Sequence, residues 1–194
     1  MPDRPHDGDS PRLAALLDLL ATERLPRTGW LQAGMTQVES IASHAHGVAS
    51  LALALGGDVD PPLDVDRAVA LCVVHDAAEA LLSDLPRSAT ELLPAGAKAD
   101  AETAAARRLL APLAPEAAAR HAEFAEQSTR EARFAKVCDR LHLGLRLLAY
   151  GRSGVRGLGR FAGVLASLDC SEFEPAERLR RELVAAVEAS GALQ

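Results

Sequence analysis

The chain has 194 residues, a formal net charge of −6, and a composition that is 48% hydrophobic and 25% charged. This is enough apolar material for one folded domain, and no stretch is basic enough for a nucleic-acid groove. No apolar run is long enough to span a membrane, and the N-terminus lacks the apolar core of a signal peptide. The apolar content is mostly alanine and leucine with 3% aromatic residues, which favours closely packed helices over a β-sandwich. We therefore predict an all-α, cytoplasmic protein that binds neither a nucleic-acid polymer nor a membrane.

Helix start and stop signals occur along most of the chain. The first predicted helix has Ser10 as its N-cap and Pro11 as its first residue, and Pro26 follows its end. The predicted helices span residues 11–25, 40–55, 65–82, 97–111, 115–126, 129–150, 158–168 and 175–190. We interpret residues 1–10 as a flexible leader and 11–194 as a single helical bundle. The irregular segment 27–38 and the Gly-rich "GRSGVRGLGR" are predicted to be connectors, and the three cysteines to be reduced thiols.

The second predicted helix carries a histidine on its apolar face. His44 falls in line with Val48, Leu51 and Leu55 on a 3.6-residue period, so it points inward. His46 lies about 200° around the helix and is expected to meet solvent. His44 is either a metal ligand or a core histidine bonded to a carbonyl group.

The third predicted helix, "VDRAVALCVVHDAAEALL", holds three polar groups in an apolar run. His75 and Glu79 are four residues apart and share a helix face, and Asp76 lies about 100° round from them. Burying an unpaired carboxylate is costly, so such groups are normally paired with a cation or bound to a metal. No basic residue of this segment lies near enough to pair with either acid.

The long predicted helix at 129–150 supplies a second inward carboxylate, Asp139, beside its apolar stripe. On its own, Asp139 could instead pair with Arg140, His142 or Arg146 of the same helix. Two imidazoles and two carboxylates from three helices suit a divalent transition metal, with open positions for water and substrate. We therefore expect these side chains to form a metal site, with the ligands His44, His75, Asp76 and Asp139.

These motifs resemble the HD-domain metal-dependent phosphohydrolases, and within them the 5′-deoxynucleotidase group. The resemblance covers roughly residues 25 to 150. It is carried by "RTGW", by "ESIASH" for Glu-x-x-x-x-His, by "HDAAEALLSDLP" for His-Asp-x-x-Glu followed by Gly-Asp-Leu/Ile-Pro, and by "KVCD" for Lys-x-x-Asp. Ser83 stands where the family usually has glycine.

The resemblance implies an HD-type bundle with one divalent cation (Mn, Co, Mg, Zn or Fe). It implies a small-molecule nucleotide substrate, with removal of the 5′-phosphate from (deoxy)nucleoside monophosphates, and a possible homodimer. Glu79 is the candidate acid/base, with orientation of a histidine as its alternative role. The implied substrate contacts are Arg27, Trp30, Asp84, Leu85, Pro86 and Arg87. Trp30 could instead fill the core, and Arg87 could be a solvated side chain.

Other functions fit the sequence less well. HD phosphodiesterases, triphosphohydrolases and di-iron oxygenases carry further histidines, and residues 77 to 96 contain none; His121 stands alone in a charged helix end. Alarmone hydrolases place two acids together after His-Asp, whereas Glu79 stands between alanines. A metal-stabilised binding module without turnover is the alternative from another class, and the presence of Glu79 and Asp84 argues against it.

Overall fold

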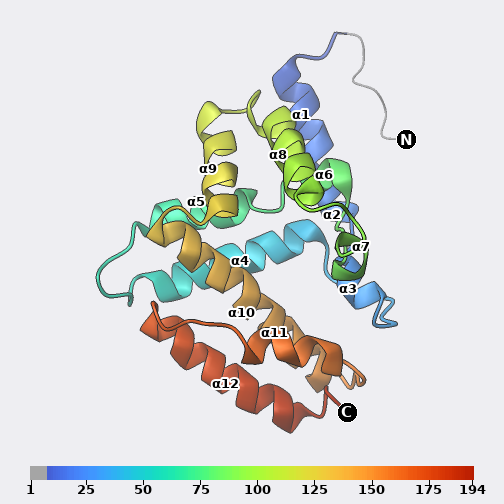
Figure 1. The fold of residues 1–194 in the computed structure, drawn as a ribbon, viewed down its shortest axis with the longest axis vertical. Coiled ribbons are helices and arrows are strands. Elements are labelled where there is room, and N and C mark those ends of the chain that lie inside the picture. Colours follow the sequence, from blue (N-terminus) through green and yellow to red (C-terminus); the bar gives the residue numbers. More distant parts are fainter. Residues whose placement is uncertain (1–7) are drawn as a thin grey trace. The chain divides into compact units, whose positions relative to one another are not determined.

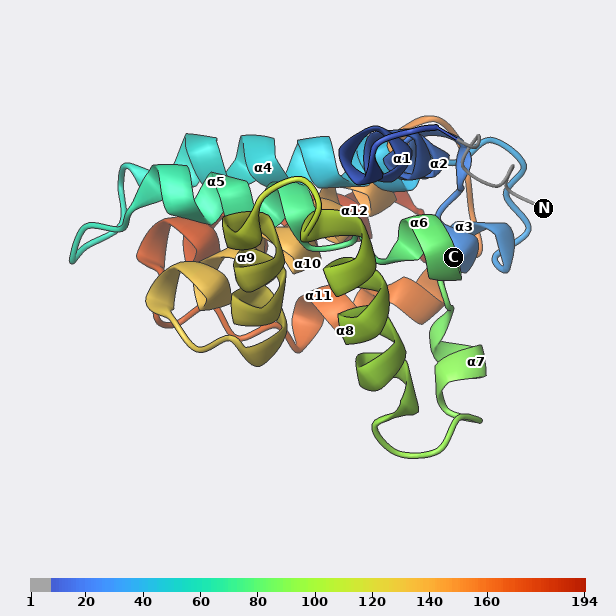
Figure 2. The same cartoon turned by 90° about the horizontal axis from the view of Figure 1, so that it is seen from above.

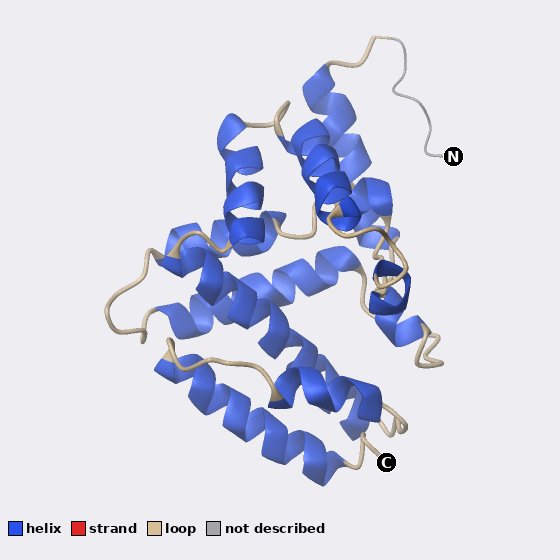
Figure 3. Ribbon diagram, in the orientation of Figure 1, coloured by secondary structure: helices blue, strands red, loops and turns tan. Residues whose placement is uncertain are grey.

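The computed structural model describes residues 8–194, and this part of the chain is built of helices and loops without a strand (Figure 3). The all-α prediction is confirmed. The helices, labelled in Figure 1, are α1 Pro11–Leu19, α2 Ala21–Arg24, α3 Thr28–Leu31, α4 Ile41–Gly56, α5 Val65–Val74, α6 Glu79–Leu82, α7 Arg87–Thr90, α8 Ala97–Leu110, α9 Pro115–Glu126, α10 Arg130–Arg152, the short 3₁₀ helix η1 Gly159–Phe161, α11 Ala162–Ala166 and α12 Glu174–Ser190. Residues 1–7 of the predicted leader lie outside the described residues, and the division at residue 10 stays a prediction.

The chain forms two compact units. Of the described residues, the first unit comprises 8–45 and 73–125, and the second comprises 46–72 and 126–194. The helices α4 and α5 each contribute residues to both units.

The core of the first unit is built from small side chains. Helix α8 packs against α6 and α1, as Figures 1 and 2 both show. The buried cluster at this contact consists of Ala77, Ala78, Ala105, Ala106, Leu109 and Leu110. Alanines on both sides let the backbones approach closely, so the turn that follows α5 is fixed against α8.

The predicted helix at 65–82 is interrupted, which corrects the sequence interpretation. Helix α5 begins after Asp64, whose Oδ1 accepts the Arg67 backbone N–H at 2.9 Å, but it ends at Val74. The next backbone N–H groups bond three residues back, for example from Glu79 to the Asp76 carbonyl at 3.0 Å, before α6 begins. His75 and Asp76 therefore lie in a turn, and His75 and Glu79 do not share one helix face. The apolar pattern runs on through residues 77 and 78 because both are buried, so it could not mark this break.

Other boundaries follow the sequence signals closely. Ser10 caps α1 through the Leu13 N–H at 3.2 Å, and Thr129 caps α10 through the Ala132 N–H at 3.1 Å. The predicted first helix is divided at Leu20 into α1 and α2. Two single-turn helices were not predicted: α3, within the connector at 27–38, and α7.

The second unit is organised around α10. This helix packs along α12, and the two run side by side in Figure 1. The predicted helix at 158–168 is shorter in the structure and consists of η1 and α11. The three cysteines are buried free thiols, as predicted. None of the helices in residues 8–194 combines the length and the apolar character needed to cross a membrane.

Candidate metal centre

Three of the predicted ligands meet at one point in the first unit. Nε2 of His75 lies 3.1 Å from Oδ2 of Asp76, and Nε2 of His44 lies 3.8 Å from the same oxygen. One ligand atom from each of the three residues lies within 4.8 Å of the others. Both histidines are buried, and the Asp76 side chain is 18% exposed. The site is thus formed from the first turn of α4 and the turn after α5.

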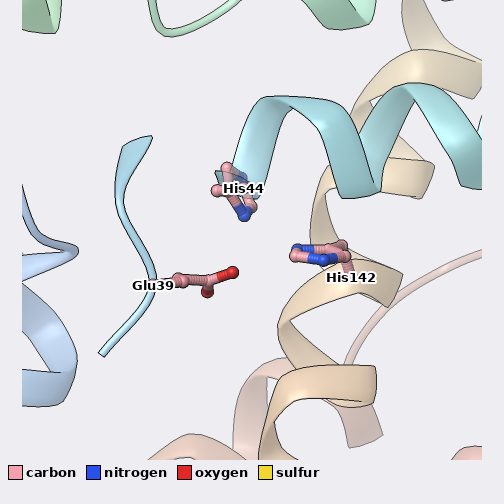
Figure 4. Close-up of side chains that lie close together, drawn as sticks. All are labelled: Glu39, His44 and His142. Atoms are coloured by element: carbon pink, nitrogen blue, oxygen red, sulfur yellow. The ribbon is translucent and has the colours of Figure 1, made fainter. Parts of the chain in front are cut away.

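The segment before α4 is held by backbone pairing. The Arg27 N–H bonds to the Glu39 carbonyl at 3.0 Å, and the Ile41 N–H bonds to the Leu25 carbonyl at 2.9 Å. This pairing places Arg27 and Glu39 beside the first turn of α4. Figure 4 shows the Glu39 side chain on the strand-like segment that leads into α4, and His44 on the helix itself; a carboxylate oxygen of Glu39 lies within 4.8 Å of a His44 nitrogen. His142, drawn in the same view, belongs to α10 of the second unit.

Arg27 is surrounded by carboxylates. Its Nη1 lies 3.0 Å from Asp76 Oδ2, 3.6 Å from Glu79 Oε2 and 3.8 Å from Asp84 Oδ1. Asp84 also accepts the Thr28 backbone N–H at 2.7 Å. One guanidinium thus fixes acids from two separate loops. Arg27 was predicted to contact substrate, and the structure shows it as the group that links the site carboxylates.

Glu79 is the second buried acid. It is 6% exposed, and its Oε2 accepts no hydrogen bond from any residue that the structure describes. Burial, together with the negative charge of Asp76, raises the pKa of Glu79 to about 9, although Arg27 opposes the shift. Burial also acts to raise the pKa of Asp76, but His75, Arg27 and His44 outweigh it and hold that pKa well below its usual range. The two carboxyl groups are therefore in different states at neutral pH: Asp76 is ionised and Glu79 is protonated.

The donor set fits a divalent cation. Two imidazoles and an ionised carboxylate are the ligand types that transition metals take in mixed N/O sites. Burying an ionised carboxylate beside two imidazoles costs free energy unless a cation or a proton compensates the negative charge of Asp76. His44, His75 and Asp76 are thus brought together as the sequence predicted.

The fourth predicted ligand belongs to the other unit. Asp139 lies on α10, 8% exposed, and its Oδ2 accepts a hydrogen bond from Lys136 Nζ at 2.8 Å. This lysine of the "KVCD" motif was not among the partners considered from the sequence, which were Arg140, His142 and Arg146. The assignment of Asp139 as a ligand stays a prediction.

The other predicted substrate contacts differ in exposure. Trp30 is 3% exposed and its Nε1 donates to Glu39 Oε1 at 3.2 Å, so the indole is part of the core. Leu85 and Pro86 are half-buried. The Arg87 side chain is 89% exposed and pairs with Glu91 at 2.8 Å, and its assignment as a substrate contact stays a prediction.

Four polar residues near this site were not selected from the sequence. Lys98 and Glu102 on α8 form an ion pair at 2.8 Å, and His121 on α9 is buried. The negative charge of Asp76 acts on both Lys98 and His121, although burial lowers the pKa of the histidine overall. The Lys98–Glu102 spacing is that of an ordinary ion pair on one helix, so spacing alone could not distinguish it from a solvated pair. The fourth is Glu39, which belongs to the "ESIASH" motif and accepts the hydrogen bond of the Trp30 indole.

An all-α chain that gathers two histidines and an aspartate beside a buried glutamate is a helical protein with a candidate divalent-metal centre. Residues 23–161 match the family model described as HD domain, and the chain belongs to this family. The resemblance stated from the sequence is confirmed.

Individual relatives agree with this assignment. The human 5′-deoxynucleotidase HDDC2 is 30% identical over 133 residues, which cover 66% of this chain and 62% of the human protein. The chain thus spans less than two thirds of the length of this relative. The Schizosaccharomyces pombe 5′-deoxynucleotidase hdd1 is 28% identical over 77% of this chain and 78% of its own length. The crystal structure of the PH0347 protein from Pyrococcus horikoshii is 30% identical, superposes with a TM-score of 0.77, and covers 89% of this chain and 98% of its own. The HD-type fold is therefore confirmed.

Proposed function

We propose that this protein is a metal-dependent phosphohydrolase that removes the 5′-phosphate from nucleoside monophosphates, with 2′-deoxy forms preferred. The observation that carries the proposal is the convergence of His44, His75 and Asp76 beside a buried, protonated Glu79. The printed names of the human and fission yeast relatives support the substrate class.

The ligand residues have one role in this proposal, which is to hold the cation. His44, His75 and Asp76 offer their side chains from the first unit, and Asp139 is proposed as the fourth ligand. A bound divalent cation of this kind polarises a phosphoryl oxygen and supplies a nucleophile at neutral pH. Arg27 contacts three acidic side chains and so fixes their positions relative to one another; these are Asp76, Glu79 and Asp84.

Glu79 is proposed to handle the proton. Because burial and Asp76 raise its pKa to about 9, the carboxyl group carries a proton at neutral pH. A protonated carboxyl group beside the reacting phosphate can donate this proton to the leaving 5′-oxygen. The alternative role, orienting a histidine, predicts a weaker effect of its removal on turnover.

Nucleotide contacts are proposed for the segment after α6. Asp84, Leu85, Pro86 and Arg87 follow one another beyond Ser83, and Arg27 links this segment to the metal ligands through Asp84. For Trp30, burial and the bond to Glu39 favour a role in fixing the segment that holds Arg27 over direct contact with a base.

The experiment that tests the proposal is a phosphate-release assay with Mn, Co, Mg or Zn added to the purified chain. Deoxy- and ribonucleoside 5′-monophosphates are compared with 3′-monophosphates, cyclic nucleotides and alarmones. We expect the 5′-monophosphates to be fastest. Faster hydrolysis of a cyclic nucleotide or an alarmone would favour another HD phosphohydrolase. A folded, metal-loaded chain that releases phosphate from none of them would favour the metal-stabilised binding module. Light scattering would test the predicted homodimer.

A further inference from the structure

Around Arg27, the acidic side chains outnumber the basic ones. Three carboxyl groups, those of Asp76, Asp84 and the protonated Glu79, lie within 3.8 Å of a single guanidinium. The positive charge of Arg27 is thus shared among acids of the chain itself. A phosphate monoester carries up to two negative charges, so a cationic side chain in addition to Arg27 and the proposed metal ion would strengthen its binding.

Helix α8 presents one such group. The face of α8 that carries Ala105, Ala106 and Leu109 packs on the turn residues Ala77 and Ala78, which lie between Asp76 and Glu79 in the chain. The same face continues one and two turns toward the helix N-terminus, because side chains recur there at intervals of three to four residues. The residues on this continuation are Glu102 and Lys98.

The Lys98 ammonium is positioned by an ion pair with Glu102 on the same helix. Its Nζ lies 2.8 Å from Glu102 Oε1, and the two side chains are 33% and 29% exposed. Partial burial acts to lower the pKa of Lys98, but the hydrogen bond and charge of Glu102, with the charges of Glu79 and Asp76, raise it. Lys98 is therefore protonated at neutral pH and close enough for the two site acids to act on it, while part of it stays accessible to a ligand.

We propose that Lys98 is a substrate-binding residue whose ammonium contacts the non-bridging oxygens of a phosphate monoester, and that Glu102 positions it. This inference rests on the proposed function for its substrate and adds a binding group from α8, which the sequence analysis did not select. The ammonium is a compact donor on a flexible stem, so it can follow a phosphate, whereas a guanidinium would place its donors differently.

The composition of the chain supports a specific use of lysine here. The sequence contains 19 arginines and two lysines, Lys98 and Lys136. Each lysine contacts an acid on its own helix, and Lys136 does so with the proposed ligand Asp139.

The test compares the wild-type chain with Lys98→Gln and Lys98→Arg, each loaded with Mn²⁺ and checked for metal content and thermal midpoint. The first readout is the dissociation constant of inorganic phosphate, measured by calorimetry, which requires no turnover. The second is the steady-state hydrolysis of dAMP with deoxyadenosine as an uncharged inhibitor. Arg107→Gln is the matched control, because it removes a positive charge from an exposed position on the opposite side of α8 from Lys98.

We expect Lys98→Gln to weaken phosphate binding and raise KM for dAMP about 10- to 100-fold, the usual effect of losing a charge-assisted hydrogen bond. The inhibition constant of deoxyadenosine should stay unchanged, Lys98→Arg should restore only part of the affinity, and Arg107→Gln should match the wild type. Unchanged phosphate affinity in Lys98→Gln, equal weakening in Arg107→Gln, or a wild type that does not bind phosphate would each overturn the proposal. A wild type that binds phosphate through Lys98 but does not hydrolyse dAMP would contradict the proposed function and leave the binding site standing.

Discussion

At the scale of single residues, burial and charge decide the roles more sharply than motif spacing does. Asp76 and Glu79 are three residues apart in one motif, yet His75, Arg27 and His44 keep the first ionised while burial keeps the second protonated. The sequence identified both as polar groups in an apolar run, which is why they could be selected. It could not assign a partner to Arg27, because that contact joins segments 49 residues apart.

The first prediction concerns Glu79→Gln. The amide keeps the size of the side chain but cannot deliver a proton, so we expect turnover to fall by about 10²- to 10⁴-fold while metal content stays near that of the wild type. Phosphate release and elemental analysis of the same preparation measure both quantities. The exposed Glu116→Gln on α9 serves as the control. Near-normal turnover of the metal-loaded variant would remove Glu79 from the mechanism.

A second residue-scale prediction concerns stability against pH in the chelator-treated protein. The pKa of Glu79 rises from 4.5 to about 9 on folding, so the folded chain holds a proton that the unfolded chain loses. The free energy of unfolding should therefore be highest near pH 5 and decrease toward pH 9, by about 1–3 kcal/mol. Urea titrations at several pH values should show this decrease in the wild type and a flatter profile in Glu79→Gln. Parallel profiles for the two proteins would contradict the raised pKa.

At the scale of elements, helix boundaries were predictable where a cap or a proline marks them and not where burial is continuous. Ser10, Asp64 and Thr129 cap α1, α5 and α10, and each bond is formed. The break after Val74 depends on the packing of the following turn against α8, and the turn at Ser83 depends on its backbone conformation. The periodicity of apolar residues reveals neither feature.

The turn at Ser83 gives a third prediction. Ser83 has φ 63° and ψ 165°, a conformation that strongly favours glycine, while its N–H donates to the Glu79 carbonyl at 2.8 Å. Ser83→Gly should raise the free energy of unfolding by about 1 kcal/mol, because relief of strain exceeds the added entropy of the unfolded chain. Ser83→Ala keeps the Cβ atom and should show no gain. Equal stability of the two variants in urea titrations would contradict the strain.

A fourth prediction tests the packing of α4 on α10 in the second unit. A Cβ atom at Gly47 would lie 2.0 Å from His142 Nε2 and 2.4 Å from its Cδ2, so the imidazole would have to move. Gly47→Ala should cost about 1–3 kcal/mol despite the better helix propensity of alanine. Gly57→Ala is the control, since a Cβ there meets nothing within 4 Å. Thermal and urea unfolding measure both, and a Gly47→Ala variant as stable as the control would contradict the close contact.

At the scale of the whole molecule, composition was sufficient to predict the fold class, but it could not predict the contacts that build the site. The alanine- and leucine-rich, aromatic-poor chain predicted helices, and the HD-domain match over residues 23–161 agrees with the motifs that the sequence displays. The position of Lys98 depends on which face of α8 packs on the turn at residues 77 and 78. That choice involves residues nearly 30 positions apart and cannot be deduced from local periodicity.

The central claim, that one divalent cation on these ligands supports phosphate-monoester hydrolysis, is tested most directly by removing and restoring the metal. The purified chain is treated with a chelator, titrated with Mn²⁺, and assayed for phosphate release from dAMP together with bound metal per chain. We predict that activity is lost on chelation and returns in proportion to the first equivalent bound, and that His75→Ala neither binds that equivalent nor recovers activity. Full activity in the metal-free chain, or recovery of His75→Ala at the same Mn²⁺ concentration, would contradict the account.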